Sequence, residues 1–405
     1  MTEPIRAEVA IVGAGPAGAA AAITLARAGR SVALIDKARF PRDKICGDGI
    51  TTGALRILEE LGVRPGHVAS WTEVADIHVV SPSHHQATFP LPRDRGQFAA
   101  VMRRTDLDEA IVDQAREAGV TMVEGVEVAG ATDGADEVVL ELADGRSVVA
   151  THVIAADGMW SPMRKYLGTA VPGYLGEWHA FRQYFTNTGP KARDLWVWFE
   201  ADLLPGYAWS FPLPDGGANV GFGIQRGAKI ATKEMKALWP ELLARPHIAE
   251  VLGPDAVPED RHQAWPIPAR TGDLALTAGR VLWVGDAAAV TDPMTGEGIG
   301  QALLTGQLAA QAILDGKGDP AAVRLGYEQA VASHLVADHK MSLLLIRALK
   351  HRKGARAAIR VADATPWTRR NFARWLFEDE PRAIAVTPRR WHRRILRRDG
   401  AYVGG

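Results

Sequence analysis

The sequence contains a single cysteine among its 405 residues, and this scarcity excludes a framework of internal disulfide bonds. That residue, Cys46, fits a reducing compartment such as the cytoplasm. Long apolar runs are also missing, since no stretch approaches the ~18 uninterrupted apolar residues of a membrane-spanning helix. Acidic Glu3 and Glu8 stand where a secretory signal would be basic, and the chain then continues into a predicted strand. We therefore expect a cytoplasmic protein without a secretory signal.

Net charge is absent as well, because 47 lysine and arginine residues balance 47 aspartate and glutamate residues. The balance is uneven along the chain: from Lys340 to Gly405 there are 17 basic residues against 5 acidic ones. The body of the chain is therefore acidic, and the basic end predicts an anionic partner. With 47% hydrophobic and 23% charged residues, the chain is globular rather than disordered. At roughly 150 residues per domain, its length predicts two or three structural units.

Glycine is concentrated in a loop near the N-terminus, where Gly13, Gly15 and Gly18 form the pattern GxGxxG. The loop follows an apolar run at 8–12 that is typical of a buried parallel strand, and an alanine-rich segment with high helix propensity comes next. In this motif the first glycine permits a tight turn, the second lets a pyrophosphate approach the backbone, and the third lets helix and strand pack closely. Asp36 ends a second predicted strand, where a carboxylate can accept hydrogen bonds from ribose hydroxyls. Together these features predict dinucleotide binding.

Later segments decide which dinucleotide is expected. Residues 280–284 form another predicted buried strand, which ends in Gly285 and Asp286 and is followed by the segment 292–298 and a predicted helix from Ile299. This pattern resembles the second FAD fingerprint of the glutathione-reductase-type, aromatic-hydroxylase-like flavoproteins. The resemblance implies that Asp286 holds the ribityl chain. It also implies that the helix points its positive end at the flavin N1/O2 edge, where it would stabilise negative charge on reduced flavin.

Two further segments carry the same resemblance. Residues 155–164 follow a predicted strand and contain DGxxSxxR, which resembles the DG motif of these flavoproteins. Arg104, with Asp108 four residues later, matches the arginine that opens the helix beside the cofactor. The chain has no second GxGxxG unit for a nicotinamide cofactor, so we expect FAD, with NADPH or another reductant as a transient electron donor. The residues that the resemblance assigns to cofactor binding are Gly13, Gly15, Ala17, Gly18, Asp36, Lys37, Cys46, Gly47, Arg104, Asp157, Gly158, Gly285, Asp286, Pro293, Gly296, Gly298 and Ile299.

Two segments indicate the subfamily. The loop at 40–49, FPRDKICGDG, resembles the loop typical of the geranylgeranyl reductase family, which includes reductases of archaeal lipid, phytyl and menaquinone prenyl chains. The segment at 204–212, LPGYAWSFP, followed by GFG at 221–223, resembles that family's YxWxFP and GxG signature, which lines the substrate cavity. One departure is that proline stands two residues before Tyr207 rather than three. The resemblance implies an FAD-dependent oxidoreductase that reduces carbon–carbon double bonds of an isoprenoid chain.

Such a reduction makes demands that candidate residues can meet. An isolated trisubstituted alkene has no carbonyl to stabilise developing charge, so it needs a hydride from flavin N5, a proton at the other alkene carbon and a dry apolar channel. Cys46 is either the proton donor or a substrate-positioning thiol, or it is a small buried hydrophobe. Tyr207 and Trp209 alternate along a strand-like run and should face the same side, where they line the pocket or fill a core. The candidate catalytic residues are Cys46, Tyr207 and Trp209, and the candidate substrate-binding residues are Tyr207, Trp209, Phe211, Gly221 and Gly223.

Other activities would use the same kind of fold. The main alternative is an FAD-dependent monooxygenase that hydroxylates an aromatic or polyketide-like substrate. A flavin-dependent halogenase is less favoured, because such enzymes rely on an active-site lysine and no lysine occurs between Lys44 and Lys165. His84 and His85 have no carboxylate or cysteine at ligand spacing, so we expect no metal site. The expected partner is an apolar isoprenoid or another lipophilic small molecule.

The expected fold class is α/β: a Rossmann-type FAD-binding domain with an inserted antiparallel β-sheet substrate domain and a C-terminal helical segment. The expected boundaries are 1–70, 96–170 and 276–325 for the FAD-binding domain, 71–95 and 171–275 for the substrate domain, and 326–405 for a basic helical region. In that region Trp367, Trp375 and Trp391 lie among arginines. This pattern fits peripheral adsorption to the inner face of an anionic membrane, or a solvated basic cap on the acidic body. Nucleic acid is not an expected partner.

Overall fold

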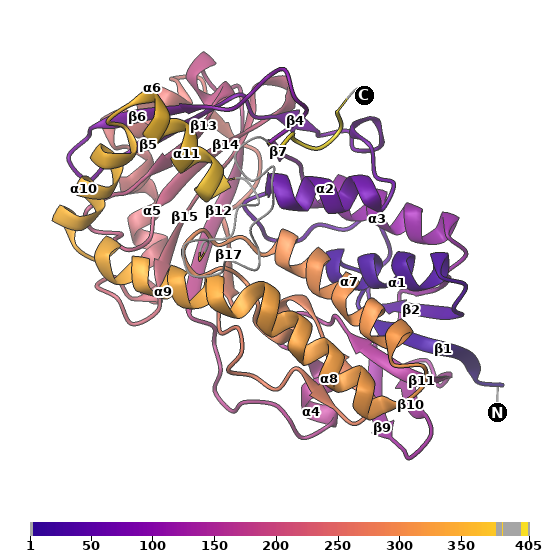
Figure 1. Cartoon of the computed structure of the whole chain (residues 1–405). Coiled ribbons are helices and arrows are strands. Elements are labelled where there is room, and N and C mark those ends of the chain that lie inside the picture. Colours follow the sequence, from indigo (N-terminus) through magenta and orange to yellow (C-terminus); the bar gives the residue numbers. More distant parts are fainter. Residues whose placement is uncertain (1–2, 378–382, 384–397, 404–405) are drawn as a thin grey trace.

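The computed structural model describes residues 3–377, 383 and 398–403, and its two large β-sheets belong to two lobes that lie side by side (Figure 1). The first sheet has a parallel core in which β19, β11, β1, β2 and β8 are neighbours in that order. β18, β10 and β9 extend it with antiparallel pairings. The strands are β1 (Ile5–Val12), β2 (Val32–Asp36), β8 (Thr121–Glu124), β9 (Val128–Asp133), β10 (Val138–Leu142), β11 (Ser147–Ala155), β18 (Thr277–Ala278) and β19 (Val281–Trp283).

The parallel strands end in register, which brings their carboxyl ends to one edge of the sheet. Val12 pairs with Ile35 on one side and with Ala155 on the other, and Ala155 pairs with Trp283. The chain therefore leaves β1, β2, β11 and β19 at neighbouring points. In open parallel sheets ligands bind outside this carboxyl edge.

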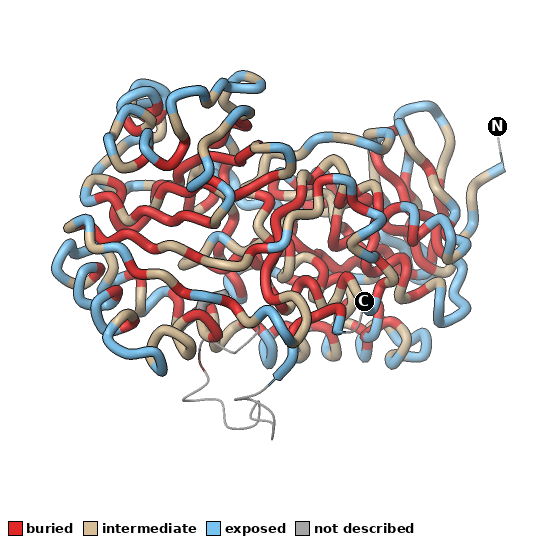
Figure 2. The backbone as a smooth tube through the Cα atoms, turned by 90° about the horizontal axis from the view of Figure 1, so that it is seen from above, coloured by how far each residue is buried: buried red, intermediate tan, exposed pale blue. Residues whose placement is uncertain are grey.

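Helices cover the first sheet, and buried residues run through the interior of both lobes (Figures 1 and 2). The alanines of α1 allow α7 to approach closely: a Cβ at Gly306 of α7 would lie 2.1 Å from the carbonyl oxygen of Ala17. Larger residues at this crossing would hold the two helices apart. The helices of this lobe are α1 (Pro16–Arg27), α2 (Thr52–Glu60), α3 (Arg104–Glu117), α4 (Pro162–Tyr166), α7 (Ile299–Asp315) and α8 (Pro320–Val331).

The second sheet is antiparallel except where β5 pairs in parallel with β13. Trp239 of α5 stacks on Phe222 of β15, with ring centroids 5.9 Å apart, and forms part of the core under this sheet. The predicted α/β fold with an inserted sheet is confirmed. The elements are, in sheet order, β16 (Val257–Pro258), β12 (Trp178–Thr186), β15 (Gly217–Gln225), β14 (Ala208–Leu213), β13 (Leu195–Trp198), β5 (Asp76–Val80) and β6 (Gln86–Pro90), with β17 (Gln263–Ile267) beside β12, and helices α5 (Met235–Leu243) and α6 (Pro246–Leu252).

A small third sheet and a helical arm join the lobes. The third sheet is formed by β3 (Gly49–Thr51), β7 (Ala99–Val101) and β4 (Thr72–Glu73). The arm begins with α8, which continues through a π-helical turn into α9 and so crosses from the first lobe to the second (Figure 1). Phe372 of α11 then packs against Phe89 of β6, with ring centroids 4.9 Å apart. The helices beyond α8 are α9 (Ala337–Leu349), α10 (Arg352–Ala362) and α11 (Pro366–Phe377).

The end of the chain returns to the first lobe without continuing as a helix. Ala401 forms an antiparallel bridge with Gln97, and the buried ring of Tyr402 meets Trp71 edge-on, with centroids 5.3 Å apart. The expectation of a helical region over 326–405 is therefore wrong for residues 398–403, because backbone and ring contacts with the first lobe replace helical ones there.

Part of the basic region cannot be compared with the structure. Trp391 and the arginines at 389–394 lie outside the described residues. Among the residues that are described, no helix is both long enough and apolar enough to cross a bilayer.

Candidate active site

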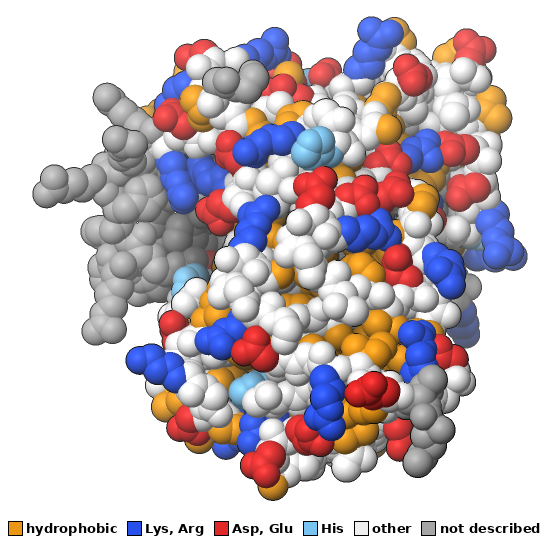
Figure 3. Space-filling view, turned by 90° about the vertical axis from the view of Figure 1, so that its right-hand side faces the viewer, with side chains coloured by type: hydrophobic (Ala, Val, Ile, Leu, Met, Phe, Trp, Pro, Cys, Tyr) orange, Lys and Arg blue, Asp and Glu red, His pale blue; other side chains and the backbone are white. Residues whose placement is uncertain are grey.

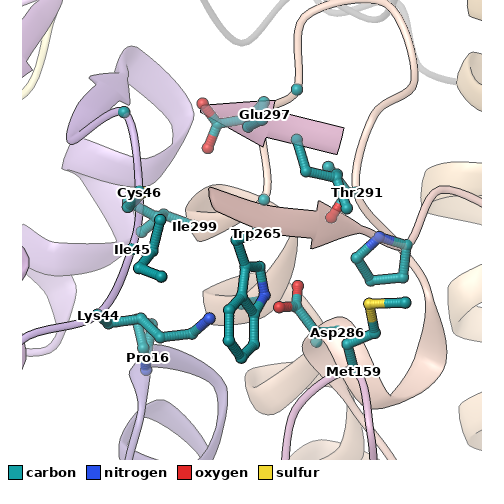
Figure 4. A pocket seen from close by; sticks show the side chains of 18 of the residues that line it. Pro16, Lys44, Ile45, Cys46, Met159, Trp265, Asp286, Thr291, Glu297 and Ile299 are labelled. Carbon is teal, nitrogen blue, oxygen red and sulfur yellow. The ribbon is translucent and has the colours of Figure 1, made fainter. Parts of the chain in front are cut away.

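A cavity of about 880 Å³ lies where the two lobes meet. Loops at the carboxyl edge of the first sheet, one face of the second sheet, and helices α9–α11 line it. Figure 4 shows Lys44, Trp265 and Asp286, which come from three distant segments, extending into one space. The volume lies within the range of roughly 300–1,000 Å³ that is usual for small-molecule sites.

The GxGxxG loop is shaped by contacts that exclude side chains. Gly13 has a φ of +101°, and a Cβ there would lie 2.3 Å from the carbonyl oxygen of Ala156. At Gly18 a Cβ would lie 1.8 Å from the carbonyl oxygen of Gly13, so this glycine lets α1 follow the turn directly. Gly15 is the N-cap residue of α1 and makes no side-chain capping hydrogen bond to the helix. The first N–H groups of the helix are therefore available to an anion.

Asp36 is held beside this loop by the backbone. Its Oδ2 accepts a hydrogen bond from the Ala14 N–H at 2.7 Å, and its Oδ1 accepts one from the Ala38 N–H at 2.8 Å. A carboxylate fixed at the end of β2, next to a helix N-terminus, can bind the ribose of a dinucleotide.

A buried arginine cluster lies next to the glycine loop. Arg104, at the start of α3, donates hydrogen bonds of 2.7 and 2.8 Å to Asp108. Arg42 forms an ion pair of 2.9 Å with the same carboxylate, and a Cβ at Gly15 would meet its guanidinium at 3.5 Å. Burial lowers the pKa of Arg104, but the charge and hydrogen bonds of Asp108 outweigh it, so the pKa lies above its ordinary value. Two arginines, one of them not predicted, thus place positive charge beside the anion site.

Two acidic side chains stand at the ends of adjacent strands. Asp286 follows β19 and makes no side-chain hydrogen bond with the described part of the chain. Asp157 follows β11; its Oδ2 accepts from the Met163 N–H at 2.9 Å, whereas its buried Oδ1 has no partner among the described residues. Burial raises the pKa of Asp157 to about 6. Arg164 of the DGxxSxxR segment donates to the carbonyl of Ala287 at 2.9 Å and so ties the two segments together.

Helix α7 begins at the edge of the cavity. Its N-cap residue, Gly298, makes no side-chain capping hydrogen bond. The neighbouring Glu297 accepts a hydrogen bond of 2.6 Å from the Gly300 N–H. The hydroxyl of Tyr207 donates to the carbonyl of Thr295 in the loop before the helix. The positive end of α7 and the start of β14 therefore meet at the same place.

An aromatic wall forms the face of the second sheet that borders the cavity. Trp209 and Phe211 of β14, and Tyr207 directly before it, lie on one side of the strand, and successive ring centroids are 6.0 Å apart. Gly221 lies behind this wall: a Cβ there would be 2.4 Å from the Trp209 ring. Gly221 therefore does not line the cavity, and its lack of a side chain makes room for Trp209.

The family is decided by similarity to known proteins. The sequence profile of the FAD-binding domain family matches residues 6–311. The chain is 35% identical over 338 residues to menaquinone reductase of Mycolicibacterium smegmatis, covering 77% of each chain. It is 32% identical over 320 residues to digeranylgeranylglycerophospholipid reductase of Methanoculleus marisnigri, covering 75% of each. The chain belongs to the geranylgeranyl reductase family of FAD-dependent oxidoreductases.

The fold of this family is found in a solved structure as well. A geranylgeranyl bacteriochlorophyll reductase-like protein from Thermoplasma acidophilum superimposes with a TM-score of 0.79 over 95% of this chain and 98% of that one. At 20% identity this likeness shows the fold alone.

The cavity of this geranylgeranyl reductase-family chain fits FAD. The open start of α1 suits the pyrophosphate, and Asp36 suits a ribose. The carboxylate of Asp286, which has no hydrogen-bond partner among the described residues, suits the ribityl hydroxyls. Gly18 and Gly221 are the two predicted site residues that do not line the cavity. Those that do are Gly13, Gly15, Ala17, Asp36, Lys37, Cys46, Gly47, Arg104, Asp157, Gly158, Tyr207, Trp209, Phe211, Gly223, Gly285, Asp286, Pro293, Gly296, Gly298 and Ile299.

Cys46 lies where the cofactor loops approach the aromatic wall. A Cβ at the next residue, Gly47, would lie 3.7 Å from the Trp209 ring. The guanidinium of Arg104 and the backbone N–H of Asp48 lie near the sulfur. Burial raises the pKa of Cys46; Arg104 opposes this rise and the charge of Asp48 adds to it. Cys46 is therefore a protonated thiol at neutral pH and can donate a proton.

Lys44 and Trp265 are cavity residues that sequence reasoning missed. The Lys44 Nζ lies 3.5 Å from the centroid of the Trp265 ring (Figure 4). Burial lowers the pKa of Lys44 to about 8, although nearby Asp286 raises it. Lys44 lies within the 40–49 loop, so the motif could have pointed to it, but Trp265 is outside every motif.

The helical wall was also missed. Ala348 and Ala358 both line the cavity and are exposed, which means that the cavity opens to solvent between α9 and α10. The available signal was apolar residues at helical spacing, which shows that a helix buries one face but not what it packs against. The lining residues from these helices are Leu345, Ala348, Leu349, Ala358, Ile359, Phe372 and Trp375.

Proposed function

We propose that this FAD-dependent oxidoreductase reduces carbon–carbon double bonds of an isoprenoid chain of the geranylgeranyl or menaquinone type. The continuity of the cavity carries the proposal, because one space joins the FAD-binding loops to an aromatic and aliphatic wall. Apolar walls suit a hydrocarbon chain. Two relatives with at least 30% identity are named for isoprenoid compounds, which supports this substrate class.

The chemistry divides between cofactor and chain. Bound, reduced FAD supplies the hydride. Cys46 holds a proton at Sγ and can give it to the alkene carbon that does not receive the hydride. Tyr207, Trp209 and Phe211 hold the chain beside this thiol, and the apolar lining excludes water from the reacting carbons.

We also propose that the electron donor, NADPH or another reductant, binds transiently. The chain has one GxGxxG strand–helix unit, and that unit is at the FAD site. A donor that leaves after reducing the flavin needs no domain of its own.

Product analysis without oxygen tests the proposal. Chemically reduced enzyme is incubated anaerobically with a geranylgeranyl lipid or a menaquinone, and the product is examined by mass spectrometry. We expect a product heavier by two hydrogen atoms for each bond reduced. Failure with both substrates, together with oxygen-dependent hydroxylation of an aromatic compound, would contradict it.

An oxygen-using enzyme, a monooxygenase or a halogenase, is the second candidate because of Lys44. Halogenation is disfavoured by the absence of lysines between Lys44 and Lys165, yet Lys44 itself lines the cavity. Its amine packs on Trp265 and lies near Asp286, at the end of the cavity that suits the cofactor. A strict requirement for oxygen in product formation would favour this candidate.

We further propose that the surface around the cavity mouth docks on an anionic membrane. The exposed apolar side chains there are Leu343, Leu344, Val361 and Trp367, with exposed fractions of 39%, 57%, 66% and 72%. Exposed basic side chains accompany them: Arg352, Lys353, Arg356 and Arg360 of α10. On the face drawn in Figure 3, by contrast, basic and acidic side chains are interspersed. Basic and apolar side chains together favour adsorption to anionic lipid, from which an isoprenoid could enter.

Vesicle flotation of charge variants tests the docking surface. The triple change Arg352→Gln, Lys353→Gln and Arg356→Gln should weaken binding to anionic phospholipid vesicles roughly 100-fold, since each basic residue contributes about 1 kcal/mol at such a surface. The matched control changes three exposed lysines near α5 to glutamine: Lys229, Lys233 and Lys236. Equal losses in both variants would contradict a docking surface at α10.

A further inference from the structure

A buried polar cluster lies in the cavity wall next to Cys46, and none of the roles assigned above uses it. Its centre is Asp48, whose exposed fraction is 0%. The Oδ2 of Asp48 accepts hydrogen bonds from the Tyr184 hydroxyl at 2.7 Å and from the Asn219 Nδ2 at 2.8 Å. Its buried Oδ1 has no partner among the described residues. A buried carboxyl group with an unused oxygen costs folding stability unless it serves the site.

The cluster is tied to Cys46 through Asn219, which binds Asp48. The Asp48 N–H also lies near the Cys46 sulfur, two residues earlier in the same loop. Asn219 Nδ2 also donates to the carbonyl of Cys46 at 2.9 Å. The Trp209 Nε1 donates to Asn219 Oδ1 at 3.1 Å, which connects the cluster to the aromatic wall. A substitution at Asp48 therefore changes the surroundings of the Cys46 thiol.

The far side of the cluster leads toward the surface. The Tyr184 ring lies between two guanidinium groups, that of Arg182 at 4.0 Å and that of Arg103 at 4.4 Å. Arg103 pairs with the partly exposed Glu259, and Arg182 pairs with the partly exposed Asp43. The Tyr184 ring thus adjoins two charged groups whose carboxylate partners are partly exposed.

The charged and titratable groups that face Asp48 come from four elements. They are Tyr184 and Arg182 of β12, Arg103 and Arg104 at the start of α3, Asn219 of β15 as a neutral donor, and Cys46 of its own loop. Burial raises the pKa of Asp48 to about 6, against the opposing effects of the hydrogen bonds from Tyr184 and Asn219 and of Arg182 and Arg104. The group therefore exchanges its proton near neutral pH, where an acid or base works best.

We propose that Asp48 is a positioning residue that keeps Cys46 protonated and returns its proton after each turnover, with Tyr184 as the link to solvent. The proposal rests on the proposed function. In the reduction, the S–H bond of Cys46 breaks and its proton goes to the alkene carbon that does not receive the hydride of reduced FAD. The O–H bond of protonated Asp48 then breaks, its proton restores the thiol, and the Asp48 carboxylate takes a proton from solvent along Tyr184.

Titration of the only thiol in the chain tests the coupling without any substrate. The rate at which iodoacetamide alkylates Cys46 in the FAD-bound protein is measured against pH. Because the negative charge of Asp48 raises the pKa of the thiol, Asp48→Asn should lower the midpoint by about one pH unit. The matched control is Asp113→Asn, an exposed carboxylate on α3 that should leave the midpoint in place. An unmoved midpoint in Asp48→Asn would overturn the proposal.

Rapid-quench kinetics then test proton return. With excess dithionite present to reduce the flavin again after each turnover, the pre-reduced Asp48→Asn variant should complete its first turnover of a prenyl substrate at nearly the wild-type rate, and later turnovers should be at least tenfold slower. Tyr184→Phe, which keeps the ring between the arginines, should slow only the later turnovers, and Asp48→Glu should restore part of the rate. If first and later turnovers slow equally in both Asp48→Asn and Tyr184→Phe, the relay is overturned. If wild-type enzyme reduces no prenyl substrate, the proposed function fails while the thiol titration still decides the coupling.

Discussion

At the scale of single residues, some side chains of the site are predictable from a local motif, whereas others come together only in the folded chain. Gly13 and Asp36 follow from local pattern, because a tight turn and a strand end require them wherever the motif occurs. The contact between Asp48 and Tyr184 joins residues far apart in the sequence, and no spacing rule predicts it. The same is true of Lys44 on Trp265.

Lys44 gives a prediction about cofactor binding. Burial lowers its pKa to about 8, so without cofactor it is mostly neutral above that pH. The negative phosphates of FAD favour the protonated amine and raise its pKa, so binding takes up a proton and affinity should fall as pH rises through about 8. Lys44→Met should weaken FAD binding about tenfold at pH 7 and remove this pH dependence.

Fluorescence titration with FAD at several pH values measures both effects. The exposed Lys165→Met serves as the control and should behave as wild type. If Lys44→Met keeps the full decline in affinity above pH 8, another group is responsible.

At the scale of elements, the parallel sheet, the inserted sheet and the helices were within reach of the sequence, but the helical wall was not. Buried Ala355, Ile359 and Ala362 recur at helical spacing in α10, and this pattern predicts a helix with one buried face. What that face covers depends on the path of α8 and α9 across the molecule, which local pattern does not encode. The parallel pair β5–β13 was missed for the same reason, since it joins strands from two separate parts of the chain.

The helical wall predicts selectivity for chain length. Ala358 lines the cavity and is exposed at its mouth, so Ala358→Trp should narrow the opening without disturbing the core. We expect KM for a long prenyl substrate to rise about tenfold while a short prenyl substrate is little affected. Steady-state kinetics with both substrates measures this.

The adjacent Ala357→Trp is a matched control. Ala357 is exposed on the same helix but does not line the cavity. Equal effects of the two tryptophans on the long substrate would contradict an entrance between α9 and α10.

At the scale of the whole molecule, the zero net charge conceals an acidic part and a basic part that have different structural roles. The acidic part of the chain builds the FAD-binding lobe and the inserted sheet, and the basic end supplies helices that complete the cavity and flank its mouth. The family resemblance extended to about residue 315 and therefore could not assign this end a role. The fold places it beside the substrate wall, which links the charge asymmetry to the site.

Anaerobic stopped-flow spectroscopy tests the proposed hydride transfer from reduced flavin to an isolated alkene most directly. Reduced enzyme is mixed with a prenyl substrate, and the absorbance of oxidised flavin is followed. We predict reoxidation without oxygen for the unsaturated chain and none for its saturated analogue. Flavin that stays reduced with every prenyl substrate, and is reoxidised only when oxygen is admitted, would contradict the proposed transfer.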